Sequence, residues 1–470
     1  MSTPPLASGP EGPRALRPLL DTVLEALDTG ARARGGPLPA GGPEAVAARV
    51  RETAGEILPD QGDPHALRTL VHAIAEGAAD PAHPLCAAHL HCPPLAVATA
   101  ADLAASALNP SLDSWDQAPA ASELETLVAR ALAREIYSDG RPHEAPEDPD
   151  SLVTTGGTES NQLALLLARE AYGGTVRLVC GTNAHHSLTR AAWLLGLPEP
   201  AVVPAPAGTL DPAALDETLT RLPGPLLVAA TAGTTDAGLI DPLPEIAARC
   251  AAHGARLHID AAYGGGLLFS TRHRAQLTGL HAADTVTLDL HKLGWQPIAA
   301  GLLAVKDPRD LTALRQRADY LNATDDTEAG LPDLLGRSLR TTRRPDALKL
   351  AVTLKTLGRA GLGTLVDQTC ARAREFAALV HDHPGFTLHA PPVISTVLFR
   401  PEGATDADVA AVRRALLTDG RAVLGRTRLD GRLWLKATLL NPATGPDDLA
   451  ALLHHVATRR ATLVEGHTPR

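Results

Sequence analysis

Short apolar runs alternate with helix-like segments through the middle of the chain, from about residue 125 to residue 305. The runs are continuous rather than alternating in polarity, which is typical of strands buried on both faces of a sheet. The pattern predicts strands at 176–180, 226–231, 256–260 and 285–289, and helices at 162–171, 187–195 and 242–253. Strands that are separated by helices indicate an α/β fold with a largely parallel sheet.

The two ends of the chain follow different patterns. Residues 15–80 show helical periodicity that a Gly- and Pro-rich stretch at 35–43 interrupts. Such helices need another surface, in this chain or in a second subunit, to bury their apolar faces. The tail predicts a small α+β domain, with helices at 345–359 and 447–459 and strands at 395–400 and 432–439. We therefore expect an N-terminal helical segment at 1–85, a large domain at 86–345 and a small C-terminal domain at 346–470.

Composition and charge narrow the classes of partner and compartment. The formal net charge is −10 and is spread along the chain without a basic block, which argues against nucleic-acid binding. No run approaches the roughly 18 apolar residues of a membrane-spanning helix, and the N-terminus has no signal-peptide pattern. The five cysteines are scattered, form no CxxC pair and are odd in number, which favours a reducing compartment. These features predict a cytoplasmic protein.

A histidine and a lysine, His291 and Lys292, follow the predicted strand at 285–289. A lysine at the end of a buried strand is costly unless its amine is neutral or used covalently. A desolvated amine loses its proton more readily and can form a Schiff base with an aldehyde. Taken alone, Lys292 could equally be a surface lysine whose stem lies along apolar atoms.

Asp260 ends the predicted strand at 256–260 in the same way. An aspartate and a lysine at adjacent strand ends suit pyridoxal phosphate (PLP), because one group can bind the ring nitrogen and the other the aldehyde. By itself Asp260 could instead cap a helix or form a salt bridge.

A Gly-Gly-Thr turn, Gly156-Gly157-Thr158, precedes the predicted helix at 162–171. Such a turn is a ready anion site, because free N–H groups and the positive end of the helix dipole point the same way. The alternative is an ordinary turn in which a threonine or serine caps the helix.

His185 and His186 follow the strand at 176–180, and Thr234 follows the strand at 226–231. Two histidines can indicate a metal, but no carboxylate or cysteine lies at suitable local spacing, so we expect none. Singly, exposed loop histidines and a simple turn are the alternatives. Taken together, four strand ends in a row carry Gly-Gly-Thr, His, Asp and His-Lys, in that order. Ligands of open α/β sheets bind at such carboxyl ends of strands.

These strings resemble the group II PLP-dependent amino-acid decarboxylases, which share the aspartate-aminotransferase (type I) fold. The resemblance covers the chain from about residue 80 to the C-terminus. It implies a mainly parallel seven-stranded sheet, a small C-terminal domain, and a homodimer that uses the N-terminal segment for dimerisation and has its active site at the interface. The matching strings are Gly156-Gly-Thr-Glu-Ser-Asn161, Ala184-His-His-Ser187, Ala232-Gly-Thr-Thr235, His258-Ile-Asp-Ala-Ala-Tyr-Gly264 and Asp289-Leu-His-Lys292, with His83-Pro84, Pro93-Pro94 and the segment 109–125 upstream.

The resemblance implies a role for each matching residue. Lys292 would hold PLP as a Schiff base, Asp260 would keep the pyridine nitrogen protonated, and His185 would stack on the ring. The remaining cofactor contacts would come from Gly157 and Thr158 at the phosphate, Ala262 under the ring, Thr234 near the ring hydroxyl and His291 at the phosphate or substrate.

A polar, acidic and aperiodic stretch at 320–330 predicts a mobile loop. By resemblance, Tyr320 in this loop protonates the substrate α-carbon after carbon dioxide leaves, and relatives that form aldehydes instead tend to lack this tyrosine. Arg343 or Arg344 matches a basic position that would meet the substrate carboxylate or close the site.

The substrate-side loop carries His89 and Cys92 where aromatic-specific relatives place bulky rings, which argues against a flat aromatic substrate. Asp113, from the partner subunit, would receive a distal ammonium. The strings look most like diaminobutyrate- or lysine-type enzymes, but the apolar segment at 298–302 leaves a small aliphatic, valine-like substrate open.

The resemblance thus implies decarboxylation of an L-amino acid to its amine and carbon dioxide. Oxidative deamination to an aldehyde, transamination and lyase chemistry remain alternatives on the same fold. A binding protein that has kept the fold without activity is a third possibility, against which the presence of Lys292, Asp260 and His185 argues.

Overall fold

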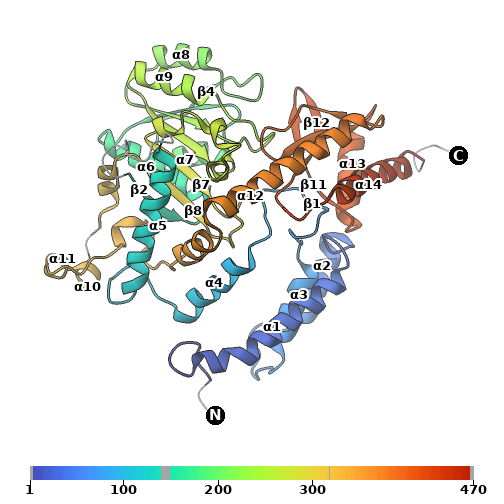
Figure 1. The fold of residues 1–470 in the computed structure, drawn as a ribbon, viewed down its shortest axis with the longest axis horizontal. Coiled ribbons are helices and arrows are strands. Elements are labelled where there is room, and N and C mark those ends of the chain that lie inside the picture. The colour runs from blue at the N-terminus through green and yellow to red at the C-terminus, as the bar shows by residue number, and fades with distance from the viewer. Residues whose placement is uncertain (1–3, 139–148, 317, 466–470) are drawn as a thin grey trace. The chain divides into compact units, whose positions relative to one another are not determined.

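The computed structural model of the protein describes residues 4–138, 149–316 and 318–465 (Figure 1). The chain forms two compact units. The terminal unit combines Met1–Pro93 with Thr369–Arg470, and the central unit is Pro94–Gln368. Among the described residues, no helix combines the length and the apolar character that crossing a bilayer requires.

A seven-stranded sheet forms the core of the central unit, in the order β2-β8-β7-β6-β5-β3-β4. Strands β4, β3, β5, β6 and β7 pair in parallel, whereas β8 runs antiparallel to both β7 and β2. The mainly parallel sheet predicted from the sequence is therefore confirmed. The strands are β2 Asp150–Thr154, β3 Arg177–Gly181, β4 Ala201–Val203, β5 Leu226–Thr231, β6 Arg256–Ala261, β7 Thr285–Asp289 and β8 Gly301–Val305.

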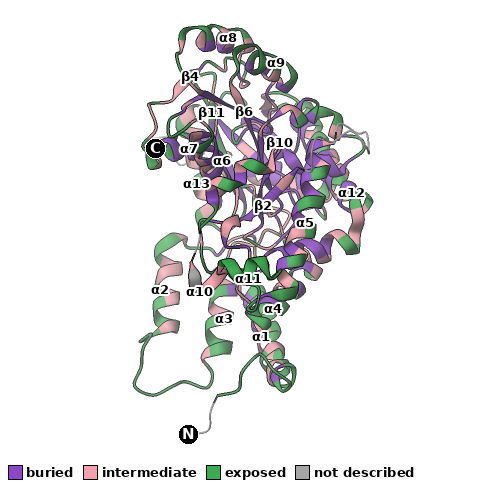
Figure 2. Cartoon of the chain, turned by 90° about the vertical axis from the view of Figure 1, so that its left-hand side faces the viewer, coloured by how far each residue is buried: buried purple, intermediate pink, exposed green. Residues whose placement is uncertain are grey.

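Helices follow most of these strands and bury the faces of the sheet. Leu165 of α6 and Leu188 of α7 pack in one apolar cluster with Leu178 of β3 and Leu227 of β5. All residues of β5, β7 and β8 are buried, which explains why their sequences read as continuous apolar runs. Figure 2 shows buried residues, in purple, around the labelled strands β2 and β6 of the same sheet. The helices of this unit are α4 Ala96–Leu108, α5 Pro119–Tyr137, α6 Gly157–Ala171, α7 His186–Leu194, α8 Pro212–Arg221, α9 Leu243–His253, α10 Asp319–Asn322 and α11 Thr324–Glu328.

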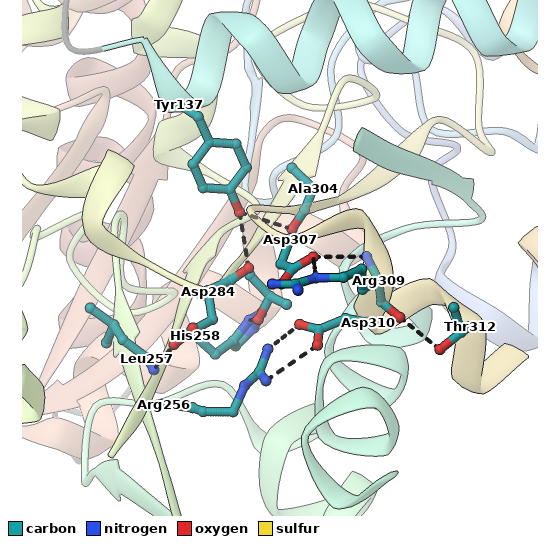
Figure 3. Close-up of polar contacts among 11 residues, drawn as sticks. Tyr137, Arg256, Leu257, His258, Asp284, Ala304, Asp307, Arg309, Asp310 and Thr312 are labelled. Carbon is teal, nitrogen blue, oxygen red and sulfur yellow. Dashed lines mark hydrogen bonds and ion pairs between the residues drawn. The ribbon is translucent and has the colours of Figure 1, made fainter. Parts of the chain in front are cut away.

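The amino ends of β6 and β7 are closed by structural polar contacts (Figure 3). Arg256 forms an ion pair with Asp310, and Asp284 accepts a hydrogen bond of 2.7 Å from the backbone N–H of Leu257. The hydroxyl of Tyr137 lies 3.2 Å from the carbonyl oxygen of Asp284. These contacts leave the opposite edge, the carboxyl ends of the parallel strands, as the edge where a ligand site is expected.

The terminal unit contains a five-stranded sheet in the order β1-β11-β12-β10-β9. The short strand β1 pairs in parallel with β11, which joins the N-terminal part of the chain to the C-terminal part. The three parts expected from the sequence thus map onto two compact units. The elements are helices α1 Gly12–Arg34, α2 Gly42–Ala54, α3 Ala66–Gly77, α13 Asp406–Thr418 and α14 Pro446–Glu465, and strands β1 Cys86–Ala87, β9 Phe386–Leu388, β10 Thr396–Pro401, β11 Val423–Leu429 and β12 Arg432–Thr438.

Two stretches depart from the sequence expectation. The segment at 320–330, expected as a loop without periodicity, contains most of α10 and all of α11; two aspartates in the first turn of α11 favour a helix there by opposing its dipole. The helix expected at 345–359 is α12, Ala347–Asp382, which continues past Gly358. Gly358 has φ 61°, a left-handed conformation that glycine adopts at little cost, so two helical segments join there.

Candidate active site

The candidate site lies where the central parallel strands end. In the sheet register, Thr231 of β5 lies opposite Asp260 of β6. Asp260 in turn lies opposite Thr287 of β7. Because these strands run in the same direction, Asp260 and the residues that follow β7 open on one edge of the sheet.

Lys292 follows β7 in a tight turn, in which its N–H donates to the carbonyl oxygen of Asp289. Its Nζ lies 3.0 Å from Oδ2 of Asp289, a side chain that is only 2% exposed. Nε2 of His291 lies 3.6 Å from the same oxygen, and burial lowers the pKa of His291. The other oxygen of Asp289, Oδ1, is buried and has no hydrogen-bond partner among the described residues. A buried acceptor of this kind suits a ligand group that donates a proton or carries positive charge.

Asp260 is held by one donor on each oxygen. The amide Nδ2 of Asn161 donates to Oδ2 at 2.8 Å, and the backbone N–H of Ala262 donates to Oδ1 at 3.1 Å. An ionised carboxylate still has lone pairs to accept one more hydrogen bond, which is what a protonated ring nitrogen offers.

His185 is the N-cap residue of α7, and its Nδ1 accepts a hydrogen bond of 3.3 Å from the N–H of Ser187. Burial lowers the pKa of His185, and the charge of Asp260 opposes that effect. Lys292 and Asp289 also act on the pKa of this ring, which places both charges near it. His185 is therefore a neutral, half-buried ring among the charged groups of the site.

A glycine turn provides a cradle for an anion. Helix α6 begins at Gly157, and its N-cap residue Gly156 makes no side-chain cap. A Cβ on Gly156 would lie 2.9 Å from Cε1 of His291, and one on Gly157 would lie 3.1 Å from both Cβ of Ala262 and Oδ2 of Asp289. The turn thus has no room for side chains, and its backbone N–H groups remain available to a phosphate.

Thr234 lies in the turn that follows β5 and is 2% exposed. Its Oγ1 accepts a hydrogen bond of 3.0 Å from the N–H of Leu239. The same turn packs against Tyr263, because a Cβ on Gly233 would lie 3.0 Å from the tyrosine Cβ. The hydroxyl of Thr234 therefore keeps its own hydrogen for a further acceptor.

The other predicted residues have separate surroundings. Tyr320 is 83% exposed on α10. Arg343 is buried, and its guanidinium donates two hydrogen bonds, of 2.9 and 2.6 Å, to Glu125. A substrate carboxylate would have to displace Glu125 to reach it. Asp113 is also buried and accepts a hydrogen bond of 2.7 Å from the side chain of Gln117.

His89 and Cys92 belong to the terminal unit rather than the central one. Burial lowers the pKa of His89, and nearby Lys436 and Arg413 act in the same direction. Among the described residues, no group of histidine, cysteine and acidic side chains is arranged to hold a metal ion.

Two polar residues that lie within the matching strings, but to which the sequence assigned no role, belong to the site. Asp289 contacts the amine of Lys292, and Asn161 contacts Asp260. A partial signal existed for both, since Asp289 is the polar end of an apolar strand and Asn161 is a buried polar residue in the apolar helix α6. The partner of Asn161 could not be identified from the sequence, because Asp260 is 99 positions away.

Comparisons with known proteins identify the family of the chain. The model of the pyridoxal-dependent decarboxylase conserved domain matches residues 56–402. An L-2,4-diaminobutyrate decarboxylase from Rhizobium meliloti is 41% identical over 85% of this chain and 81% of its own length. A protein of the same name from Acinetobacter baumannii is 34% identical over 80% of this chain and 79% of its own. The crystal structure of the glutamate decarboxylase domain of a diaminobutyrate-pyruvate transaminase and L-2,4-diaminobutyrate decarboxylase from Vibrio parahaemolyticus has a TM-score of 0.84 and 31% identity, covering 97% of this chain and 98% of that one.

Proposed function

The chain belongs to the pyridoxal-dependent decarboxylase family, and on that premise we propose that its substrate is an L-amino acid with a second amino group. L-2,4-diaminobutyrate is the first candidate, because two relatives that carry this substrate in their names match most of the chain.

The residues of the site fit PLP. The backbone of Gly157 and Thr158 would hold the phosphate, Asp260 the ring nitrogen and Lys292 the aldehyde. Ala262 and His185 would lie on the two faces of the ring, with Thr234 near its hydroxyl and His291 at the phosphate or substrate. When bound, PLP supplies an electron sink for the electrons released as the Cα–carboxylate bond breaks. The observation that carries this assignment is the pairing of Asp260 and Lys292 at the ends of adjacent parallel strands, beside a glycine turn that excludes side chains.

The side chains of the protein would then orient charges and move one proton. The donors from Asn161 and Ala262 keep Asp260 ready to hold a proton on a ring nitrogen. Asp289 orients the amine of Lys292. Tyr320 would deliver a proton to the substrate α-carbon from a segment that has closed and excluded water. Its present exposure of 83% fits a residue that is covered only when substrate is bound.

We also propose roles for four residues on the substrate side of the site. Asp113 would receive the distal ammonium, and His89 and Cys92 would line the substrate pocket. Arg343 would meet the substrate carboxylate only after its ion pair with Glu125 opens. We also propose a cytoplasmic homodimer with its active site at the interface. Exposed apolar side chains on the N-terminal helices, Leu24 on α1 and Ile74 on α3, each 63% exposed, support such a partner surface.

A panel of L-amino acids tests the proposed reaction. Purified protein with added PLP is given diamino, aliphatic, acidic and aromatic substrates, and carbon dioxide, amine and aldehyde are measured. We expect fastest release of carbon dioxide from a diamino acid, with the amine in equal amount. Release from aromatic or acidic substrates only would refute the substrate proposal, and aldehyde in place of amine would point to the oxidative alternative.

An absorbance spectrum tests the cofactor assignment separately. The wild-type protein should show the visible band of protein-bound PLP, and Lys292→Ala should lose it. Lys306→Ala is a matched control. Lys306 directly follows β8, which runs antiparallel to β7, so it lies at the amino end of β7, whereas Lys292 lies at the carboxyl end. A band that survives in Lys292→Ala, or no band in the wild type with added PLP, contradicts the assignment.

A further inference from the structure

Asn161 lies at the centre of a buried network of polar side chains in the central unit. Asn161 is only 1% exposed, and its side-chain amide lies within hydrogen-bond distance of four residues. Nδ2 lies 2.8 Å from Oδ2 of Asp260 and 2.9 Å from Oγ of Ser187. Oδ1 lies 3.0 Å from Nε2 of His258 and 2.9 Å from Oγ1 of Thr287. All the hydrogen-bonding capacity of Nδ2 is therefore used.

The chemistry of the partners fixes the direction of each bond around Asn161. An ionised Asp260 only accepts, so the NH2 group of Asn161 faces it. That orientation turns Oδ1 toward His258 and Thr287, which must both donate. His258 therefore carries a proton on Nε2. Because burial lowers the pKa of His258 to about 4, the ring is neutral near pH 7, and its Nδ1, 2.9 Å from Oγ1 of Thr285, accepts from that hydroxyl.

The hydrogen bonds of Asn161 continue through Ser187 to the half-buried ring of His185. The second hydrogen of the Asn161 amide goes to Oγ of Ser187, so the hydroxyl hydrogen of Ser187 is free to donate elsewhere. Nδ1 of His185 lies 2.8 Å from this oxygen and also accepts from the backbone N–H of Ser187. With two donors aimed at Nδ1, the ring proton of His185 must sit on Nε2.

We propose that Asn161 is a positioning residue that determines the direction of the hydrogen bonds at two groups of the cofactor site, Asp260 and His185. It holds Asp260 as an acceptor and, through Ser187, holds His185 as a neutral ring protonated on Nε2. The part that concerns PLP rests on the proposed function. A neutral ring can lie against a protonated pyridine without charge repulsion, so one amide coordinates the groups assigned to the ring nitrogen and to the ring face.

Nuclear magnetic resonance on cofactor-free protein tests the bond directions directly. Protein labelled with 15N-histidine is measured near neutral pH, and the two rings are assigned from His185→Gln and His258→Gln. Both rings should be neutral, with hydrogen on Nε2 and an acceptor signature on Nδ1. An Nδ1–H tautomer at either ring would overturn the proposal. This measurement needs neither PLP nor substrate, so it stands even if the proposed reaction is wrong.

Asn161→Asp keeps the shape of the side chain and removes the two donated hydrogens. Ser187 then loses its donor, and Asp260 and His258 face a second carboxyl group in place of the amide. We expect PLP binding, followed by absorbance titration, to weaken about tenfold or more, as the loss of a hydrogen bond to a charged group implies. The new carboxylate should also raise the pH at which His258 takes up a proton by about one pH unit or more.

Asn183→Asp is the matched control. Asn183 also donates, at 2.8 Å, to a buried aspartate, but that aspartate, Asp241, is not one of the four residues that Asn161 contacts. The control should keep the tautomers of both histidines and a PLP affinity within about twofold of wild type, even if its stability falls. Equal weakening in both variants, or an unchanged affinity and unchanged histidine signals in Asn161→Asp, would refute the proposal. If Asn161→Asp does not fold, the tautomers of the wild-type protein still decide it.

Discussion

Arg343 could bind a substrate carboxylate, or it could stabilise the fold through its buried ion pair with Glu125. Replacing it by methionine distinguishes these two roles. The side chains of Arg343 and Glu125 are 2% and 1% exposed. Their two-pronged contact joins α5 to the segment before α12 within the central unit. Methionine keeps much of the volume of arginine but removes the positive charge.

The magnitude of the effect follows from this burial. A buried carboxylate that loses its counter-charge costs about 3–5 kcal/mol. Glu125 can limit the loss by taking up a proton, and protonating an ordinary glutamate at pH 7 costs about 4 kcal/mol. We therefore expect Arg343→Met to lower the free energy of unfolding by about 3–4 kcal/mol at pH 7. The loss should shrink as the pH falls towards 5, because protonation then costs less.

Urea unfolding followed by tryptophan fluorescence measures this change, and initial rates give KM and kcat in parallel. Arg337→Met is the matched control, because Arg337 also pairs through two bonds with a carboxylate, Asp150, but is 20% exposed. It should lose less stability. The double variant Glu125→Leu with Arg343→Met should recover most of the loss, since well-packed apolar residues can replace a buried pair. Unchanged stability in Arg343→Met with a KM raised about tenfold or more would refute the structural role and support substrate binding.

Three other changes test single features of the site. Tyr320→Phe should keep the visible PLP band but slow amine formation by about a hundredfold, measured by product analysis; unchanged amine formation would exclude the proposed proton transfer. Gly156→Ala, whose Cβ would lie 2.9 Å from His291, should weaken PLP binding about tenfold in an absorbance titration; Gly173→Ala, with φ 72° but no atom near its Cβ, should leave that affinity unchanged. Burial lowers the pKa of His258 to about 4, below the ordinary value of about 6.5, so the unfolded chain binds the proton first. Stability should therefore fall by roughly 3 kcal/mol between pH 6.5 and pH 4 on account of this residue; urea unfolding against pH should show a smaller fall in His258→Gln, and equal falls would contradict the assignment.

The strands could be predicted from the sequence because of how they are buried. Parallel strands covered on both faces leave an uninterrupted apolar signal, and β5 and β7 begin and end at the residues expected. The same signal marked the cofactor residues, since Asp260 and Lys292 stand out where apolar runs stop. The short helices α10 and α11, of four and five residues, gave no such signal, because one turn of helix is too short to establish a period.

The polar partners could not be predicted, because they come from distant parts of the chain. Asn161 meets His258 across 97 positions and Thr287 across 126, and Arg343 meets Glu125 across 218. Residue type and local spacing are the same whether such a side chain faces a substrate or a buried partner. Arg343 was accordingly expected at the substrate from its motif alone, whereas its ion pair became visible only in the fold.

Two aspartates that flank one strand show why strand direction decides what a polar residue does. Asp284 precedes β7 and Asp289 ends it. The carboxylate of Asp284 accepts from the N–H of Leu257 and lies among structural contacts at the amino ends of the strands (Figure 3). The carboxylate of Asp289 meets the amine of Lys292 at the carboxyl ends. Their local sequences do not distinguish them. Because β6 and β7 run parallel, the polar ends of both strands gather on the same edge, and only there can charges from separate strands act on one ligand.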